Sequence, residues 1–142
     1  MRSLVLDTSV ILKWLPRNVE SLAAEAEAIR EAIERGSISL TVAPLFFAEA
    51  VNVIVRKWHF APSHAVEAGE LLENLGLTIV QPPLSRVMIW ANHGLTGYDA
   101  TWVALAEYLG VPLITADVRL ARLANDVAAS LADFDVDAFL AP

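Results

Sequence analysis

Short apolar runs alternate with helical patterns along this chain, and that alternation restricts its fold more than any other feature. Strand-like runs cover residues 3–6, 38–42, 77–80, 113–115 and 127–131. Helical patterns cover residues 8–15, 20–35, 44–58, 62–75, 84–92, 98–109 and 117–124. Strands that alternate with helices are typical of an α/β fold with a mostly parallel sheet. We therefore expect a central sheet of four to five strands with helices packed against it.

Proline and glycine mark several of the predicted helix boundaries. Pro16 ends the first helix, because proline is not tolerated in a helix interior. Gly36 ends the second helix, and Pro44 suits the first position of the third. Residues 133–142 form an acidic and apolar tail, and the sequence contains no repeat, linker or low-complexity segment. The sequence therefore predicts a single domain over residues 1–142.

The composition points to a protein that buries apolar surface against a partner. Hydrophobic residues make up 56% of the 142 residues, yet no uncharged run approaches the roughly 20 residues that a membrane span needs. We therefore expect an oligomer or a dedicated binding protein, and no membrane association. The absence of cysteine excludes disulfides and thiolate metal sites and suits a reducing, cytoplasmic location. The first apolar run is also too short for a signal peptide.

The net charge of −7 argues against nucleic-acid binding driven by bulk charge. It does not exclude a nuclease, because such an enzyme can hold phosphates through metal ions and a few local cations. Six cations lie a short way along the chain from acidic residues, and we expect most of them to be solvated: Lys13, Arg17, Arg56, Lys57, Arg119 and Arg122.

Four acidic residues stand where apolar segments end or are interrupted: Asp7, Glu49, Asp99 and Asp117. A carboxylate placed against a core is unfavourable unless a cation or hydrogen bonds meet it. If the fold gathers the four, each close pair repels by roughly 4 kcal/mol at an effective dielectric of 20. A divalent metal ion is the simplest remedy. The pattern therefore indicates metal-assisted chemistry.

Three of these acids also have a structural interpretation. Asp7 and Asp117 could each cap the helix that follows, and Asp99 comes three residues after Thr96, as in a capping box. Glu49 is harder to explain in this way, and its structural alternative is a buried pair with Asn52 that neighbouring backbone groups satisfy. Its helix is otherwise almost wholly apolar over residues 44–55, so we expect that helix to be largely buried.

Taken together, the acids favour a functional site over separate caps. Asp7 and Asp117 follow predicted parallel strands, and ligands bind beyond the carboxyl ends of such strands. Thr8 and Ser9 add hydroxyls that can hold a carboxylate or a water molecule. Oxygen ligands without histidine or cysteine suit Mg²⁺ or Mn²⁺.

The histidines and tryptophans carry weaker signals. The three histidines lack metal-ligand spacing and are expected at the surface or at helix ends: His59, His64 and His93. The tryptophans could stack on bases, but aromatic residues on helices are more often core or interface: Trp14, Trp58, Trp90 and Trp102. No nucleotide-binding loop or serine-hydrolase elbow is present.

Four segments resemble the successive motifs of PIN-domain ribonucleases, and most closely those of the toxin subunits of VapBC-type toxin–antitoxin pairs. They are residues 4–10 (LVLDTSV), 49–53 (EAVNV), 95–100 (LTGYDA) and 113–120 (LITADVRL). The resemblance covers nearly the whole chain, in order. It implies a three-layer α/β/α domain that binds Mg²⁺ or Mn²⁺ and cuts RNA through a water molecule activated by the metal. It also implies a homodimer that a cognate antitoxin inhibits.

The resemblance assigns roles to the acids. Asp7 and Asp99 would bind the metal directly, while Asp117 would support a second metal or the attacking water. Glu49 would complete the acidic pocket, and Thr115 would orient a carboxylate or water. Gly97 and Tyr98, just before Asp99, stand where family members vary, which leaves the sequence preference open.

Three alternatives remain beside this interpretation. A receiver-like signalling domain also binds Mg²⁺ at strand ends, but it needs a second acid after Asp7, where Thr8 stands, and an aspartate after the third strand, where Gln81 stands. A catalytically idle PIN-like binding module would keep the fold alone. A structure-specific nuclease acting on DNA would use the same metal site, because that site does not recognise the 2′-hydroxyl.

Overall fold

Five parallel strands form the centre of the molecule in the computed structural model, which describes residues 1–16 and 21–142. The strands are β1 (Arg2–Leu6), β2 (Ile38–Val42), β3 (Thr78–Ile79), β4 (Leu113–Thr115) and β5 (Ala128–Ser130). Their order across the sheet is β3-β2-β1-β4-β5, and each neighbouring pair is parallel. The predicted α/β fold with a parallel sheet of four to five strands is confirmed.

The strand order contains a reversal beside β1. The chain adds β2 and β3 on one side of β1, then returns to place β4 and β5 on its other side. The register pairs Leu6 with Ile114, so the residues that follow, Asp7 and Thr115, are level at the carboxyl ends of β1 and β4. Such a reversal opens a crevice at the strand ends, where parallel sheets bind ligands.

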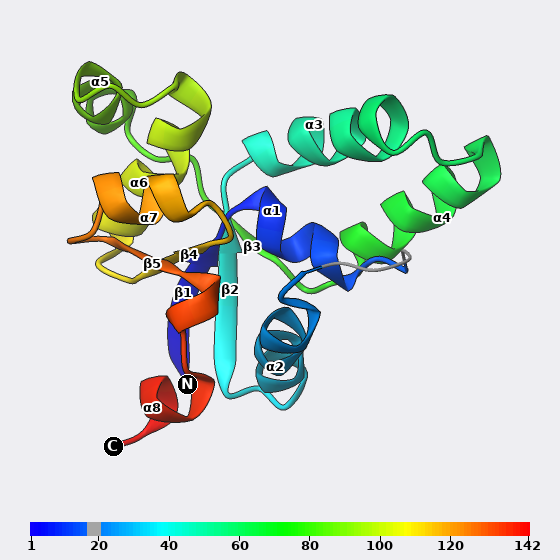
Figure 1. The fold of residues 1–142 in the computed structure, drawn as a ribbon, viewed down its shortest axis with the longest axis horizontal. Helices are drawn as coiled ribbons and strands as arrows, with labels where there is room; N and C mark the ends of the chain where they lie inside the picture. Colours follow the sequence, from blue (N-terminus) through cyan, green and yellow to red (C-terminus); the bar gives the residue numbers. More distant parts are fainter. Residues whose placement is uncertain (17–20) are drawn as a thin grey trace.

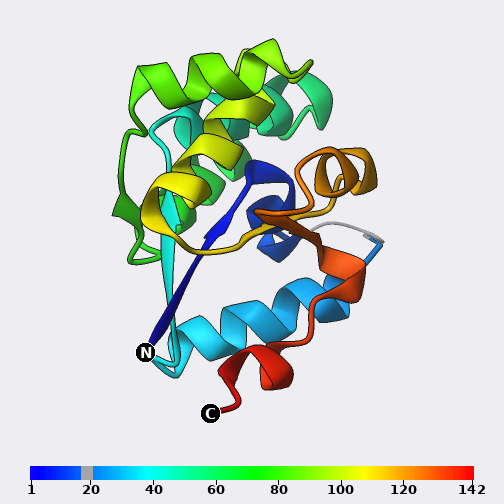
Figure 2. The same ribbon diagram turned by 90° about the vertical axis from the view of Figure 1, so that its left-hand side faces the viewer.

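Helices lie on both sides of this sheet and complete the three layers. The α-helices are α1 (Thr8–Ile11), α2 (Ala23–Glu34), α3 (Leu45–Val51), α4 (Pro62–Glu73), α5 (Leu84–Asn92), α6 (Gly97–Leu109), α7 (Val118–Leu123) and α8 (Val136–Leu140). Short 3₁₀-helices cover Leu12–Trp14 (η1) and Leu131–Asp133 (η3), and a π-helix covers Asn52–Lys57 (η2). Figures 1 and 2 place α2 and α6 on opposite sides of β1.

The core is built from the strands and α6. The side chains of Leu4, Leu6 and Ile114 are fully buried in the sheet, and Trp102 of α6 is buried beside them at 2% exposure. Alanines on α6, such as Ala104, are also fully buried, and α6 packs against both β1 and β4. This close packing fixes the first turn of α6, and therefore Asp99, near the carboxyl edge of the sheet.

The predicted helix over residues 44–58 differs from the structure in two ways. It is an α-helix only as far as Val51 and continues as the π-helix η2. It is also not largely buried, since Val51 is 59% exposed and Val55 43% exposed. In Figure 1 α3 and α4 extend together beyond the sheet, so one face of this helix has no core to pack against.

The predicted tail over residues 133–142 contains the short helix α8. Asp135 caps this helix, because its side chain accepts a hydrogen bond from the backbone N–H of Ala138 at 3.0 Å. Arg2 links the two ends of the chain, since its guanidinium donates to the carbonyl of Ala141 at 2.8 Å and lies over the Phe139 ring.

Two sequence expectations fall on residues that the structure does not describe. The predicted start of the second helix at residue 20 and the cation Arg17 lie outside the described residues. Among the residues that are described, no helix is long and apolar enough to span a membrane.

Candidate functional site at the carboxyl edge of the sheet

Asp7 follows β1 directly and is buried, with 7% of its surface exposed. Its carboxylate makes no capping bond to α1. It accepts hydrogen bonds from the hydroxyl of Ser9 on one oxygen and from that of Thr115 on the other. Asp7 still occupies the N-cap position of α1, and the backbone N–H of Val10 helps to lower its pKa, so capping is secondary to the two hydroxyl contacts. The expectation that the hydroxyls of Thr8 and Ser9 hold a carboxylate is confirmed, since Ser9 donates to Asp7 and Thr8 donates to Glu49.

The surroundings of Asp7 favour its protonated form. Burial raises its pKa to about 6, although the hydroxyls of Ser9 and Thr115 act in the opposite direction. The nearby carboxylate of Glu49 raises the pKa further. At neutral pH the Asp7 carboxylate is still mostly ionised, and a bound cation would offset the unfavourable burial of its charge.

Glu49 projects from α3 toward the same strand ends. One of its oxygens, Oε1, accepts hydrogen bonds from the Thr8 hydroxyl at 2.8 Å and from the indole N–H of Trp102 at 2.9 Å. Thr8 lies next to Asp7 in the chain, so this contact holds the two carboxylates near each other. The contact from Trp102 has no signal in the sequence, because 53 residues separate the partners.

Asp99 and Asp117 form a second pair of acids at this edge. Asp99 opens α6, where its backbone N–H donates to the Thr96 hydroxyl at 3.1 Å. Asp117 caps α7, since its Oδ1 accepts from the backbone N–H groups of Arg119 and Leu120 at 2.9 and 3.2 Å. The predicted cap at Asp117 is confirmed, and of the capping box predicted at Asp99 the bond to the Thr96 hydroxyl is present.

The electrostatics of Asp99 link it to Asp117. Burial raises the pKa of Asp99, and the negative charge of Asp117 raises it further. Arg119 lowers it, because its guanidinium pairs with the Asp99 carboxylate at 3.4 Å. Asp99 is therefore an acid under charge repulsion that an exposed arginine partly offsets.

Two contacts connect the pairs. The Thr115 hydroxyl donates to Asp7 and also accepts the backbone N–H of Asp117 at 3.0 Å. Trp102, one turn after Asp99 on α6, donates to Glu49. The structure therefore brings Asp7 together with Glu49, and Asp99 together with Asp117, at one edge of the sheet.

The donor chemistry of this edge fits a hard divalent ion, because carboxylate and hydroxyl oxygens are the ligands that Mg²⁺ and Mn²⁺ prefer. The side-chain positions are less complete. Over residues 1–16 and 21–142, no group of three or more acidic or histidine side chains is close enough to hold one metal ion. A shared ion would need the two pairs to approach each other and Arg119 to move away from Asp99.

A pocket of about 510 Å³ lies directly beside Glu49. Its lining includes the hydroxyl residues next to Asp7, two lysines and a tryptophan: Thr8, Ser9, Leu12, Lys13, Glu49, Val53, Lys57, Trp58 and Ala116. Trp58 is half-buried against the core, as sequence reasoning expected, and it also forms part of this pocket wall. Lys13 and Lys57 were among the cations near acids.

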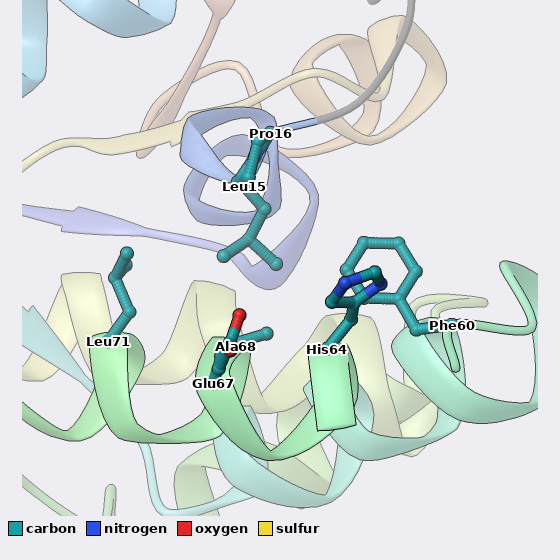
Figure 3. Close-up of a pocket in the computed structure, with 7 residues that line it drawn as sticks. All are labelled: Leu15, Pro16, Phe60, His64, Glu67, Ala68 and Leu71. Carbon is teal, nitrogen blue, oxygen red and sulfur yellow. The ribbon is translucent and has the colours of Figure 1, made fainter. Parts of the chain in front are cut away.

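A second pocket, of about 480 Å³, lies between α4 and the segment that follows η1. Figure 3 shows Leu15 and Pro16 on one side and His64, Ala68 and Leu71 of α4 on the other. None of the four acids lines this pocket. The three histidines are all exposed, as predicted.

The fold and this edge define an α/β domain with acidic residues at the reversal point of a parallel sheet. The family model for the PIN domain matches residues 4–126. The chain belongs to the PIN domain family. A search of curated proteins found no match.

Solved structures share the fold at low sequence identity. PAE2754 from Pyrobaculum aerophilum is 21% identical, with 99% of this chain and 96% of that chain covered and a TM-score of 0.66. VapBC-1 from nontypeable Haemophilus influenzae is 20% identical, with 92% and 99% covered and a TM-score of 0.64. FitAcB from Neisseria gonorrhoeae is 15% identical, with 92% and 99% covered and a TM-score of 0.59.

Proposed function

We propose that this protein is an endoribonuclease that depends on Mg²⁺ or Mn²⁺ and serves as the toxin of a toxin–antitoxin pair. Its membership of the PIN domain family supports nuclease chemistry. The observation that carries the proposal is the buried carboxylate of Asp7, held by two hydroxyls at the reversal point of the sheet.

The roles that we assign to the acids are those that the resemblance to PIN-domain ribonucleases implies. We assign Asp7 and Asp99 as direct metal ligands, and Asp117 as a ligand or holder of the attacking water. Glu49 would add negative charge beside Asp7, while Ser9 and Thr115 fix the orientation of the Asp7 carboxylate. A bound divalent ion would offset charge on the scissile phosphate and activate water for in-line displacement.

The test is cleavage of a structured RNA by the purified protein with Mg²⁺ or Mn²⁺. We expect cleavage that EDTA stops and that the Asp7→Asn variant lacks. Equal cleavage by wild type and variant would point to a contaminant or to another mechanism. A single-stranded DNA of the same sequence in a parallel reaction separates a ribonuclease from a nuclease that acts on DNA.

A catalytically idle PIN-like module is the second candidate. It is favoured by the separation of the acids into two pairs and by the contact of Arg119 with Asp99. An idle module would bind neither Mn²⁺ nor Mg²⁺ at millimolar concentration and would leave RNA and DNA intact in the same assay.

The toxin role implies a protein partner and a homodimer in the cytoplasm. Similar solved structures include VapBC and Fit toxin–antitoxin proteins, which supports a cognate antitoxin. Exposed apolar side chains on η2 and α5, such as Val55, Leu84 and Met88, offer surface for such contacts. We expect expression of the protein alone to arrest growth and Asp7→Asn to abolish the arrest. Light scattering of the purified variant should give the mass of a dimer.

A further inference from the structure

We propose that the pocket beside Glu49 binds one nucleotide of single-stranded RNA next to the scissile phosphate, with a phosphate at Lys57 and the base against Trp58. This inference rests on the proposed ribonuclease function and names its substrate subsite. Thr8 and Ser9 line the pocket, and the Ser9 hydroxyl donates to the Asp7 carboxylate. An RNA chain cut beside Asp7 therefore has this pocket next to it.

The π-helix η2 makes this pocket wall possible. In a straight α-helix, with about 100° per residue, Trp58 would point about 180° away from Glu49. In the structure the backbone N–H of Trp58 bonds to the carbonyl of Val53, five residues earlier, at 2.8 Å. This wider turn brings Glu49, Val53 and Trp58 onto the same pocket. Single π-turns are rare and occur frequently at functional sites.

The backbone after η2 supports the position of the Trp58 ring. His59 adopts a left-handed conformation at φ 55°, which is uncommon outside glycine and reverses the chain. The ring of Phe60 then packs 5.9 Å from that of Trp58, at an interplanar angle of 32°. Trp58 is therefore a supported aromatic wall. An unpaired base can stack on such a wall whatever its identity.

The pocket contains two positively charged side chains, although the protein as a whole is acidic. The chain carries −7, yet two lysines line the same hollow as Glu49. Lys13 lines the pocket and donates to the carbonyl of Ser21 at 2.8 Å. Lys57 is exposed, and within the part of the chain that the structure describes no hydrogen bond or ion pair engages it. A phosphate is the group that such an exposed lysine would hold.

The experiment measures binding and not cleavage. Full-length protein carrying Asp7→Asn, which prevents turnover, is titrated against a fluorescein-labelled single-stranded RNA, and Kd is read from anisotropy. Lys57→Ala and Trp58→Ala are added to this background, with Trp58→Phe as the conservative variant. Arg56→Ala is the matched control, because Arg56 is the adjacent exposed cation and does not line the pocket. Melting temperatures identify any variant that fails to fold.

We expect Lys57→Ala and Trp58→Ala each to weaken binding by about tenfold, while Trp58→Phe and Arg56→Ala change it less than threefold. Equal losses for Lys57→Ala and Arg56→Ala would overturn the proposal, because bulk charge would then explain the binding. If Lys57→Ala and Trp58→Ala leave RNA binding unchanged but abolish binding of a co-expressed antitoxin, the proposal is overturned as well. The pocket would then be a binding site for that protein. If the wild type cleaves RNA, but Lys57→Ala and Trp58→Ala bind RNA as tightly as the Asp7→Asn protein that carries neither change, the pocket assignment alone fails. If the protein neither binds nor cuts RNA, the proposed function fails with it.

Discussion

The Thr115 hydroxyl at the end of β4 donates a hydrogen bond to the carboxylate of Asp7, which follows the neighbouring strand β1 and lies 108 residues away in the chain. The same oxygen accepts the backbone N–H of Asp117 at 3.0 Å. One small side chain therefore connects the end of β1 to the start of α7. It holds the two acids that follow adjacent strands in a fixed relation.

Replacing Thr115 with valine tests this connection. The substitution keeps the shape but removes one donor from a buried carboxylate, which raises the pKa of Asp7 further. We expect the free energy of unfolding at pH 8 to fall by about 1–3 kcal/mol. Thr115→Ser keeps the hydroxyl and should recover most of the loss. A valine variant as stable as wild type in urea denaturation at this pH would show that the hydrogen bond contributes little.

Asp7 predicts an unusual pH dependence of stability. Its folded pKa of about 6 lies above the ordinary 3.8, so the folded protein holds the proton more tightly than the unfolded chain. This contribution is present below about pH 4 and is lost as the pH rises through about 6. For the metal-free protein the loss amounts to about 3 kcal/mol at most.

The Asp7→Asn variant isolates this contribution, because it removes the buried charge and leaves the other titrating groups in place. We expect the variant to be more stable than wild type at pH 8, and this difference to disappear near pH 4. Urea denaturation of both proteins without metal, at several pH values, measures the difference. A wild type that gains stability over the variant as the pH rises would reverse the sign and refute the assignment.

Arg119 predicts a competition for Asp99. Its guanidinium meets the carboxylate at 3.4 Å but is 60% exposed, so the pair is weak. A cation that binds Asp99 must displace it. We expect Arg119→Gln to tighten Mn²⁺ binding several-fold in calorimetric titration, while Arg122→Gln, on the same helix, leaves it unchanged. Weaker Mn²⁺ binding by Arg119→Gln would show that the arginine assists the metal site.

The strands and most helix ends could be predicted because local signals specify them. β2 and β4 match their apolar runs residue for residue, and the cap at Asp117 follows from its place after β4. The π-helix η2 could not be predicted, since the apolar pattern of residues 44–58 is equally typical of an α-helix. The turn that widens it depends on how the chain packs.

The acids of the site could be proposed from the sequence, but their pairing could not. Asp7 and Asp117 follow parallel strands, and that placement alone predicts the edge at which they lie. The contact of Trp102 with Glu49 and that of Arg119 with Asp99 depend on the packing of α6 and α7. Side-chain contacts of this kind leave no periodic signal in a single sequence.

The most direct test of the metal-site claim is anomalous diffraction from a crystal of the protein soaked in Mn²⁺. We expect one main anomalous peak at the carboxyl edge of the sheet, in contact with the carboxylates of Asp7 and Asp99 and close to that of Asp117. Arg119 should have moved away from Asp99 in that structure. A crystal saturated with Mn²⁺ that shows no peak there, with the Arg119–Asp99 pair intact, would contradict the account.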